Sequence, residues 1–258
     1  MIRKSNLSSA LFRFTPSCTI FATDMRSYNH IFIDLDDTVW DFNANSHIAL
    51  ALTYENLHLH NICSDYDRFS SLYYAKNAEL WNLYHHGKIG RDFLIIERFA
   101  FPLRECGYID KENKLATHIN KCYLETLSLQ TKLVPQAYDM LCYLRDKNYK
   151  LYILSNGFIE VQARKLQAGG IEQFFSRIVL SDEIGINKPD RRIFDYALEV
   201  TGSDAASSLM IGDNYDTDIM GAAHAGWGQI YFDRYGKGYT GEAPQHTIHS
   251  LSEISLIL

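Results

Sequence analysis

The sequence predicts an α/β protein: a Rossmann-like, doubly wound parallel sheet with an inserted all-helical cap domain. Short apolar runs alternate with helical patterns of 9 to 12 residues, which is typical of βαβ units and a parallel sheet. One stretch of 88 residues without a strand pattern interrupts the alternation, and it is far longer than an ordinary crossover. Clusters of acidic, hydroxyl and basic residues directly follow four of the apolar runs.

Five apolar runs of four to six residues are expected to form the buried strands. They span residues 30–35, 150–154, 177–180, 208–211 and 229–232. Helices are expected at 135–147, 160–168, 189–200 and 216–225. Pro135 and Pro189 suit the first turns of two of these helices. The apolar residues of 246–258 predict a last short helix or strand against the core.

Residues 46–133 predict a helical cap domain over a core domain formed by residues 29–45 and 134–258. Four helix-like segments lie in this stretch, at 46–60, 66–86, 91–106 and 111–129, punctuated by Gly87, Gly90, Pro102 and Gly107. The aromatic residues of the cap could stack on a base or sugar. Because the cap is no richer in aromatics than the whole chain, most of them are expected to pack between helices. The pairs His58/His60 and His85/His86 lack further ligands at metal spacing and are expected to be surface or cap-facing residues.

The first 28 residues differ from the rest. Basic and hydroxyl residues precede the first acid, Asp24, and the apolar stretch is broken by Arg13 and Pro16, so a secretory signal is not expected. We expect an N-terminal extension that is disordered, or a mis-called start with Met25 just before the first strand. An organelle transit peptide is the alternative.

Charge and cysteine content exclude several classes of protein. A net charge of −6 and a pI near 5.9 give no overall attraction for a nucleic acid polymer or an anionic membrane. No apolar run approaches the ~18 residues that span a bilayer. The five cysteines are odd in number and form no CxxC pair, so we expect neither a thiolate zinc site nor a disulfide framework. A reducing compartment, the cytoplasm, is therefore predicted.

Two acidic clusters follow predicted strands. Asp34, Asp36 and Asp37 come after the first, and the fourth is followed by Gly212, Asp213, Asp216 and Asp218. Like charges raise one another's pKa, so a bound cation would stabilise such clusters. The alternative for each cluster is an Asp-rich turn or a helix cap.

Two further motifs follow the second and third strands. Ser155-Asn156-Gly157 offers a hydroxyl, an amide and a turn, which could cradle an anion or form an ordinary turn. Lys188 lies just before Pro189 and a predicted helix N-terminus, where its ammonium could face an anion. The alternative for Lys188 is a solvated surface lysine. Ligands of open parallel sheets bind outside the carboxyl ends of the strands, so all four motifs are expected to meet there.

At these positions the sequence resembles the haloacid dehalogenase superfamily, whose members carry DxDx[TV], a Ser or Thr, a Lys and a GD-type acidic motif. The motifs stand here as Asp34-Leu35-Asp36-Asp37-Thr38, Ser155, Lys188, and Gly212-Asp213 through Asp218. The resemblance covers about residues 29–235, including the helical cap inserted after the first motif.

The resemblance implies a role for each of these residues. Asp34 would be the nucleophile that forms an aspartyl-phosphate, and Asp36 the general acid and then the general base. Mg²⁺ would be bound by Asp34, the main-chain carbonyl of Asp36 and Asp213. The remaining roles are phosphate binding by Thr38, Ser155, Asn156 and Lys188, charge neutralisation by Lys188, and orientation of Lys188 or a metal-bound water by Asp218. Dehalogenases of the superfamily lack the second acid, so Asp36 favours phosphate chemistry.

The expected function is a Mg²⁺-dependent phosphomonoester hydrolase for a small phosphorylated metabolite, acting as a monomer or homodimer. Segments around Asp34, Ser155 and Gly212–Gly221 resemble the noncanonical pyrimidine 5′-nucleotidases, so pyrimidine nucleoside monophosphates are the expected substrates. The alternatives are a sugar-phosphate phosphatase or a phosphomutase resembling β-phosphoglucomutase. A non-catalytic phosphate-binding protein is a further alternative, against which the complete set of acids and the lysine argue.

Overall fold

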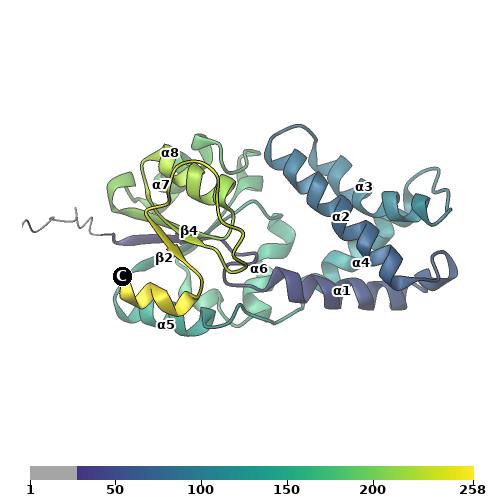
Figure 1. Cartoon of the computed structure of the whole chain (residues 1–258), viewed down its shortest axis with the longest axis horizontal. Helices are drawn as coiled ribbons and strands as arrows, with labels where there is room; N and C mark the ends of the chain where they lie inside the picture. The colour runs from purple at the N-terminus through teal and green to yellow at the C-terminus, as the bar shows by residue number, and fades with distance from the viewer. Residues whose placement is uncertain (1–27) are drawn as a thin grey trace, which may run out of the picture.

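The computed structural model describes residues 28–258 and contains a six-stranded parallel sheet in the order β3-β2-β1-β4-β5-β6 (Figure 1). The strands are β1 (His30–Ile33), β2 (Lys150–Ser155), β3 (Arg177–Leu180), β4 (Ser208–Gly212), β5 (Gly228–Phe232) and β6 (His246–Ile248). The five predicted strands are present, with ends shifted by at most two residues. The sixth comes from the C-terminal segment, which continues as a short helix, η6 (Leu251–Leu256). Our predictions for an N-terminal extension concern residues 1–27, which lie outside the described residues, and Tyr28, which is buried.

Strand β1 lies at the centre of the sheet, at the point where the strand order reverses. Its last residue, Ile33, pairs with Ile153 of β2 and Ile211 of β4, so the three strands end almost level. Phe32 packs into one core layer, whereas Ile31 and Ile33 pack into the other, as the two-residue period of a strand requires. Such a reversal point is where open α/β sheets bind their ligands.

Helices cover both faces of the sheet. On the Phe32 face pack α7 (Arg191–Thr201) and α8 (Gly221–Ala225), the latter preceded by a π-helical turn, η5 (Tyr215–Met220). The opposite face carries α5 (Ala137–Asp146) and α6 (Ile159–Ala168). Pro135 and Pro189 lie just before α5 and α7 rather than in their first turns. Helix α7 begins later because Asp190 accepts the Arg192 N–H and is the N-cap.

The cap is a block of helices beside the sheet (Figure 1). They are α1 (Phe42–Asn56), α2 (Tyr66–His85), α3 (Arg91–Glu105) and α4 (Lys114–Ser128), with a short turn of helix, η1 (Leu59–Asn61). Helix α1 begins four residues earlier than predicted because Asp41 accepts the Ala44 N–H as its N-cap. Pro102 lies inside α3, as it does in the predicted segment 91–106, and removes one main-chain hydrogen-bond donor from the helix.

Aromatic side chains form the centre of the cap. Tyr73 stacks on Phe99 with ring centroids 4.8 Å apart, and both contact Tyr123 at 5.5 Å. All three are fully buried, as is Phe69. These contacts match the expectation that most cap aromatics pack between helices. None of the described helices is long and apolar enough to cross a membrane.

The cap leaves and rejoins the core at adjacent points. The Asp41 N–H donates to the Lys132 carbonyl at 3.1 Å, and the Val134 N–H donates to the Val39 carbonyl at 3.0 Å. The side-chain amide of Asn45 donates to the same Lys132 carbonyl at 2.8 Å and accepts the Lys132 N–H at 3.2 Å. The two connections therefore run side by side as one hydrogen-bonded junction.

A disulfide joins Cys63 to Cys106, with their Cα atoms 5.3 Å apart. We expect no disulfide framework from the cysteine spacing, and that expectation does not include this single bond. Cys63 lies just before α2 and Cys106 is the C-cap of α3, and packing of these two helices brings the ends together across 43 residues of sequence. Cysteine spacing does not encode this proximity. The argument for a reducing compartment, which depended on the absence of a disulfide, therefore loses its basis.

Candidate active site

A cavity of about 180 Å³ lies at the carboxyl edge of the sheet, facing the cap. Its walls come from the loops after β1, β2 and β4, the segment before α7, and the ends of two cap helices. All four predicted motifs reach it. The predicted residues that line it are Asp34, Asp36, Ser155, Asn156, Lys188, Asp213 and Asp218.

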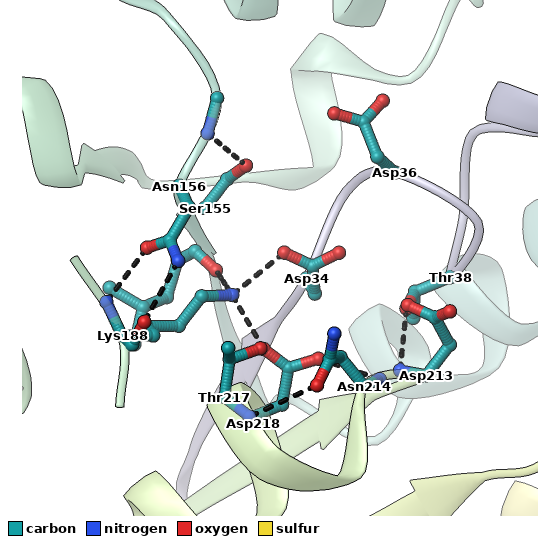
Figure 2. Close-up of polar contacts among 12 residues, drawn as sticks. Asp34, Asp36, Thr38, Ser155, Asn156, Lys188, Asp213, Asn214, Thr217 and Asp218 are labelled. Atoms are coloured by element: carbon teal, nitrogen blue, oxygen red, sulfur yellow. Dashed lines mark hydrogen bonds and ion pairs between the residues drawn. The ribbon is translucent and has the colours of Figure 1, made fainter. Parts of the chain in front are cut away.

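Lys188 holds the centre of the site, and its ammonium has three acceptors (Figure 2). The Nζ atom lies 2.7 Å from a carboxylate oxygen of Asp34, 2.7 Å from one of Asp218 and 2.6 Å from the Leu154 carbonyl. Each ammonium hydrogen thus has a partner, as a charge that is only 2% exposed requires. Burial lowers the pKa of Lys188, but the two carboxylates outweigh it and hold the pKa above its usual value. The surface-lysine alternative is excluded.

Asn156 fixes the main chain of Lys188. Its side-chain amide donates to the Lys188 carbonyl at 3.0 Å, and its Oδ1 atom accepts the Lys188 N–H at 2.8 Å (Figure 2). Asn156 follows β2 and Lys188 precedes α7, so this pair ties two loops of the sheet edge together. The side chain of Asn156 is therefore engaged with the protein, although the residue lines the cavity.

Ser155 presents its hydroxyl to the cavity as a donor. Its Oγ atom accepts the Gly157 N–H at 3.1 Å and a side-chain hydrogen of Gln162 at 2.8 Å. A hydroxyl oxygen has two lone pairs, so both are used by these bonds and the hydroxyl hydrogen stays free. This arrangement suits a negatively charged ligand.

Three carboxylates lie close together at the strand ends, two of them buried and the third, Asp213, partly buried. Asp34, Asp213 and Asp218 each offer an oxygen, and the three oxygens lie within 4.8 Å of one another. Burial raises the pKa of Asp213 well above its usual value, and the charges of Asp34 and Asp218 raise it further. Burial also raises the pKa of Asp34 to about 7, against the opposing effect of Lys188. Among the described residues, Lys188 forms ion pairs with Asp34 and Asp218 but not with Asp213, so the three carboxylates keep an excess of negative charge that favours a cation.

Thr38 and Gly212 shape this acidic cluster. The Thr38 hydroxyl accepts the Asp213 N–H at 3.1 Å and lies 3.5 Å from a carboxylate oxygen of Asp213. Thr38 is fully buried and does not line the cavity. A Cβ atom at Gly212 would lie 2.2 Å from Oδ2 of Asp218. Only glycine therefore lets the Asp218 carboxylate approach the strand end closely enough to reach Lys188.

The second acidic motif does not cap its helix with an aspartate. The cap is Asn214, whose Oδ1 atom accepts the N–H groups of Asp216 and Thr217 at 3.1 Å each. The Asn214 N–H in turn donates to Asp218 at 3.1 Å. Asp218 is buried inside the turn, whereas Asp216 is exposed. The turn thus directs one acid of this motif into the site.

Asp36 is held by two residues that sequence reasoning missed. Lys165 Nζ lies 2.7 and 3.0 Å from the two Asp36 carboxylate oxygens, and Gln162 Nε2 lies 3.0 Å from one of them. Both residues belong to α6 and are buried. The Asp36 carboxylate points away from Asp34 (Figure 2). The only signal in the sequence was the three-residue spacing of two polar residues on one face of a predicted helix.

The cap contributes Trp81 and His85 to the cavity wall. They lie four residues apart on one face of α2, and Trp81 stacks on Phe158 with ring centroids 5.3 Å apart. Burial, and then the charge of Lys188, lower the pKa of His85 to about 4, so its ring is neutral near pH 7. The sequence predicts that the His85/His86 pair is surface or cap-facing and binds no metal. His86 is exposed, but His85 lines the cavity.

A family model described as haloacid dehalogenase-like hydrolase matches residues 28–226. The chain belongs to this family. The match includes β1 to β4 and the whole helical cap. The Rossmann-like fold with a helical cap and the membership expected from the four motifs are both confirmed.

Several members of this haloacid dehalogenase-like hydrolase family are similar over nearly the whole chain. The HAD-hydrolase YfnB of Bacillus subtilis is 31% identical over 91% of this chain and 97% of its own. A crystal structure of YfnB bound to magnesium, described as revealing interdomain movement, superposes with a TM-score of 0.80 over 90% of this chain and 98% of that one. The pyrimidine 5′-nucleotidase YjjG of Escherichia coli is 29% identical over 90% of this chain and 98% of its own. A glyceraldehyde 3-phosphate phosphatase of Pyrococcus abyssi is 30% identical over 80% and 82%.

Proposed function

We propose that this protein is a Mg²⁺-dependent phosphomonoester hydrolase that acts through an aspartyl-phosphate on Asp34. The observation that carries the proposal is the buried lysine between two carboxylates at the end of β1. Lys188 holds Asp34 at the cavity, and Ser155 offers a free hydroxyl hydrogen on the same side. A carboxylate nucleophile beside a fixed cation and an anion donor is the constellation that phosphoryl transfer needs.

The reaction takes two steps with balanced protons. Asp34 attacks phosphorus, the bond from phosphorus to the ester oxygen breaks, and Asp36 gives its proton to that oxygen. Water then attacks the phosphorus of the aspartyl-phosphate, the bond to Asp34 breaks, and Asp36 takes the proton of the water. Throughout, Ser155 donates to a phosphoryl oxygen, and Lys188 balances the charge on Asp34 and the phosphoryl group.

The residues present fit a magnesium ion. Among the described residues, no Lys or Arg lies within ion-pair distance of the Asp213 carboxylate. We assign the Asp34 and Asp213 carboxylates and the main-chain carbonyl of Asp36 as its ligands, since Mg²⁺ prefers oxygen atoms. When bound, the ion offsets the charge of the phosphoryl oxygens. Asp218 then acts on Lys188, with which it forms an ion pair.

Thr38 and Asn156 have supporting roles in this proposal. The family resemblance implies phosphate binding by both. The Thr38 hydroxyl faces Asp213, and the Asn156 side chain is bonded to the main chain of Lys188. We therefore assign Thr38 to the orientation of Asp213, and Asn156 to the orientation of Lys188.

We propose nucleoside 5′-monophosphates, pyrimidines especially, as the substrates. The likeness to YjjG, named as a pyrimidine 5′-nucleotidase, supports this class. So does Trp81 in the cavity wall, because an indole ring offers a stacking surface to a base. A sugar-phosphate phosphatase is the second candidate, favoured by the likeness to the glyceraldehyde 3-phosphate phosphatase.

Phosphate release from a panel of phosphorylated metabolites, with Mg²⁺ and with EDTA, tests the proposal. We expect Mg²⁺-dependent hydrolysis with the highest kcat/KM for pyrimidine nucleoside monophosphates. If small sugar phosphates win by tenfold or more, the nucleotidase assignment is wrong and the phosphatase assignment stands.

Two other outcomes of the panel would overturn the hydrolase itself. Isomerised sugar phosphates without released phosphate, detected by phosphorus NMR, would indicate a phosphomutase. Binding of a phosphorylated metabolite without turnover or phosphoenzyme, checked by intact-protein mass spectrometry, would indicate a non-catalytic binding protein.

A further inference from the structure

We propose that Gln162 and Lys165 of α6 are positioning residues that fix Asp36 beside the phosphate-binding hydroxyl of Ser155. The inference deepens the proposed function and rests on it, since it concerns the proton transfer assigned to Asp36. Helix α6 lies outside the four family motifs, and the inference gives it a role in protonation of the leaving group.

Gln162 spans Ser155 and Asp36 with one amide group. Its Nε2 atom lies 2.8 Å from Oγ of Ser155 and 3.0 Å from Oδ2 of Asp36. An amide nitrogen carries two hydrogens, so one serves each acceptor. The hydroxyl that holds the phosphoryl group and the carboxylate that serves the leaving oxygen are thereby kept two hydrogen bonds apart.

The orientation of the Gln162 amide satisfies two acceptors of the site but leaves its own carbonyl oxygen without a hydrogen bond to any described residue. In the ion pair with Lys165 the ionised Asp36 carboxylate only accepts, so in this state the nitrogen faces Asp36. The carbonyl oxygen of Gln162 is then buried without a hydrogen-bond partner among the described residues, which costs free energy. Gly157 makes room for this placement, because a Cβ atom there would lie 2.0 Å from Nε2 of Gln162. The placement of the Gln162 amide between Ser155 and Asp36 therefore requires a glycine at position 157 and leaves the Gln162 carbonyl unpaired among the described residues.

Lys165 holds the same carboxylate from one helical turn away. Its Nζ atom contacts both Asp36 oxygens, at 2.7 and 3.0 Å. The ammonium also lies 4.6 Å from the ring centroid of Trp40 and 5.4 Å from that of Phe42, where the negative faces of the rings attract it. Its side chain is 4% exposed, whereas that of Asp36 is 28% exposed and reaches the cavity. Burial and the two aromatic rings hold the Lys165 ammonium in place, and the ammonium in turn holds the Asp36 carboxylate.

Together the two residues remove the rotational freedom of Asp36. A proton donor contributes to the rate only when it lies within hydrogen-bond reach of the leaving oxygen, and small displacements of such groups reduce rates strongly. Asp36 follows a strand end in an irregular loop, and among the described residues no side chain other than these two bonds to its carboxylate. Its placement therefore depends on α6.

The test compares Gln162→Met and Lys165→Met with the parent on esters whose leaving groups differ in basicity. Methionine keeps the length of both side chains and removes the donors. We expect the single-turnover rate of phosphoenzyme formation from a nucleoside monophosphate to fall about tenfold to a hundredfold, part of what a general acid supplies. For 4-nitrophenyl phosphate, whose leaving group needs little protonation, the same rate should change less than threefold. Lys165→Arg should restore part of the loss.

A double-mutant cycle separates positioning from structural damage. In an Asp36→Asn background, Gln162→Met and Lys165→Met should each change the rate of phosphoenzyme formation less than twofold, because the group they position is already gone. Arg164→Met and Gln167→Met are matched controls on the exposed face of the same helix and should leave that rate unchanged. Each variant should still unfold cooperatively, and its Mg²⁺-induced stabilisation should match the parent's.

Two results would overturn the inference while leaving the proposed function intact. One is an equal loss for 4-nitrophenyl phosphate and the nucleotide; the other is an undiminished loss in the Asp36→Asn background. A parent protein without phosphatase activity would instead overturn the proposed function.

Discussion

Asn156 and Lys188 exchange two hydrogen bonds, although 32 residues separate them in the sequence. These bonds join the Asn156 side chain to the main chain of Lys188. They therefore fix the position of the lysine main chain and do not contact its ammonium. A charged side chain at the end of a flexible four-carbon stem needs such a fixed base if its ammonium is to reach both Asp34 and Asp218.

The first prediction concerns this pair. Asn156→Ala removes both hydrogen bonds and leaves the buried N–H and carbonyl of Lys188 without these partners, at a cost of about 1–3 kcal/mol each. We expect a lower melting temperature and a lower kcat with KM little changed, because Lys188 stabilises charge that develops during the reaction. Steady-state kinetics and thermal unfolding check this. An Asn156→Ala variant with the parent's kcat would contradict the role given to the pair.

The second prediction is that Asp34→Asn abolishes turnover without unfolding the protein. An amide cannot form the phosphoenzyme, but it is nearly isosteric and still accepts from Lys188. Because burial raises the pKa of Asp34 to about 7, ionised Asp34 costs stability above that pH, and the metal-free variant should melt at or above the parent's temperature at pH 8. Asp146→Asn, an exposed acid, is the control. Hydrolysis by Asp34→Asn above a few per cent of the parent would remove Asp34 as the nucleophile.

The third prediction concerns pH and the metal. Burial raises the pKa of Asp213 and of Asp34, so the folded protein retains protons that the unfolded chain has lost, and stability falls as pH rises through the folded pKa values. In EDTA, the parent should melt at a higher temperature at pH 6.5 than at pH 8.

Mg²⁺ should reverse this loss of stability at pH 8. Asp213→Asn should reduce both the pH effect and the Mg²⁺ effect on the melting temperature, because it removes one of the carboxylates. An unchanged Mg²⁺-induced shift in Asp213→Asn would show that the ion binds elsewhere. Differential scanning fluorimetry at the two pH values measures all of these quantities.

The fourth prediction concerns substrate choice. Trp81→Leu should raise KM for nucleoside monophosphates about tenfold, since aromatic pairs contribute about 0.5–1.5 kcal/mol beyond area burial. KM for an acyclic phosphate such as glycerol phosphate should change little. Trp81→Phe should recover most of the loss, and Asn82→Ala, exposed on the same helix, should have no effect. Equal increases in KM for both substrates would assign Trp81 to cap packing alone.

The fifth prediction concerns the disulfide between Cys63 and Cys106. It closes a loop across 43 residues, and the chain-entropy model gives about 4 kcal/mol of stabilisation for such a loop. Reduction, or the double variant Cys63→Ala/Cys106→Ala, should therefore lower the melting temperature. Native protein purified without reductant should show only Cys122 and Cys142 reactive toward an alkylating agent among the described cysteines. Labelling of Cys63 and Cys106 as well would contradict the bond.

The strands and the four motifs could be predicted because each is a local pattern. A β-branched run followed at once by acids, as at Ile33-Asp34, fixes both the strand and the place of its carboxylate at the sheet edge. The side chains that complete the site are not local. Lys165 meets Asp36 across 129 residues, and His85 reaches the cavity only because α2 lies against the carboxyl edge of the sheet. The same reason hid the disulfide, since nothing in the spacing of Cys63 and Cys106 shows that α2 and α3 pair.

The junction at Asp41–Lys132 and Val39–Val134 has a consequence for how this architecture can be altered. The chain enters and leaves the cap at neighbouring hydrogen-bonded positions. The core is therefore connected to the insertion through two adjacent segments of chain, and its own structure does not depend on the length of the segment between them. A foreign helical module whose ends lie equally close together could be grafted between residues 42 and 132 without moving β1. Such a graft would exchange the cap residues that contact the substrate, while the catalytic residues of the core would stay the same.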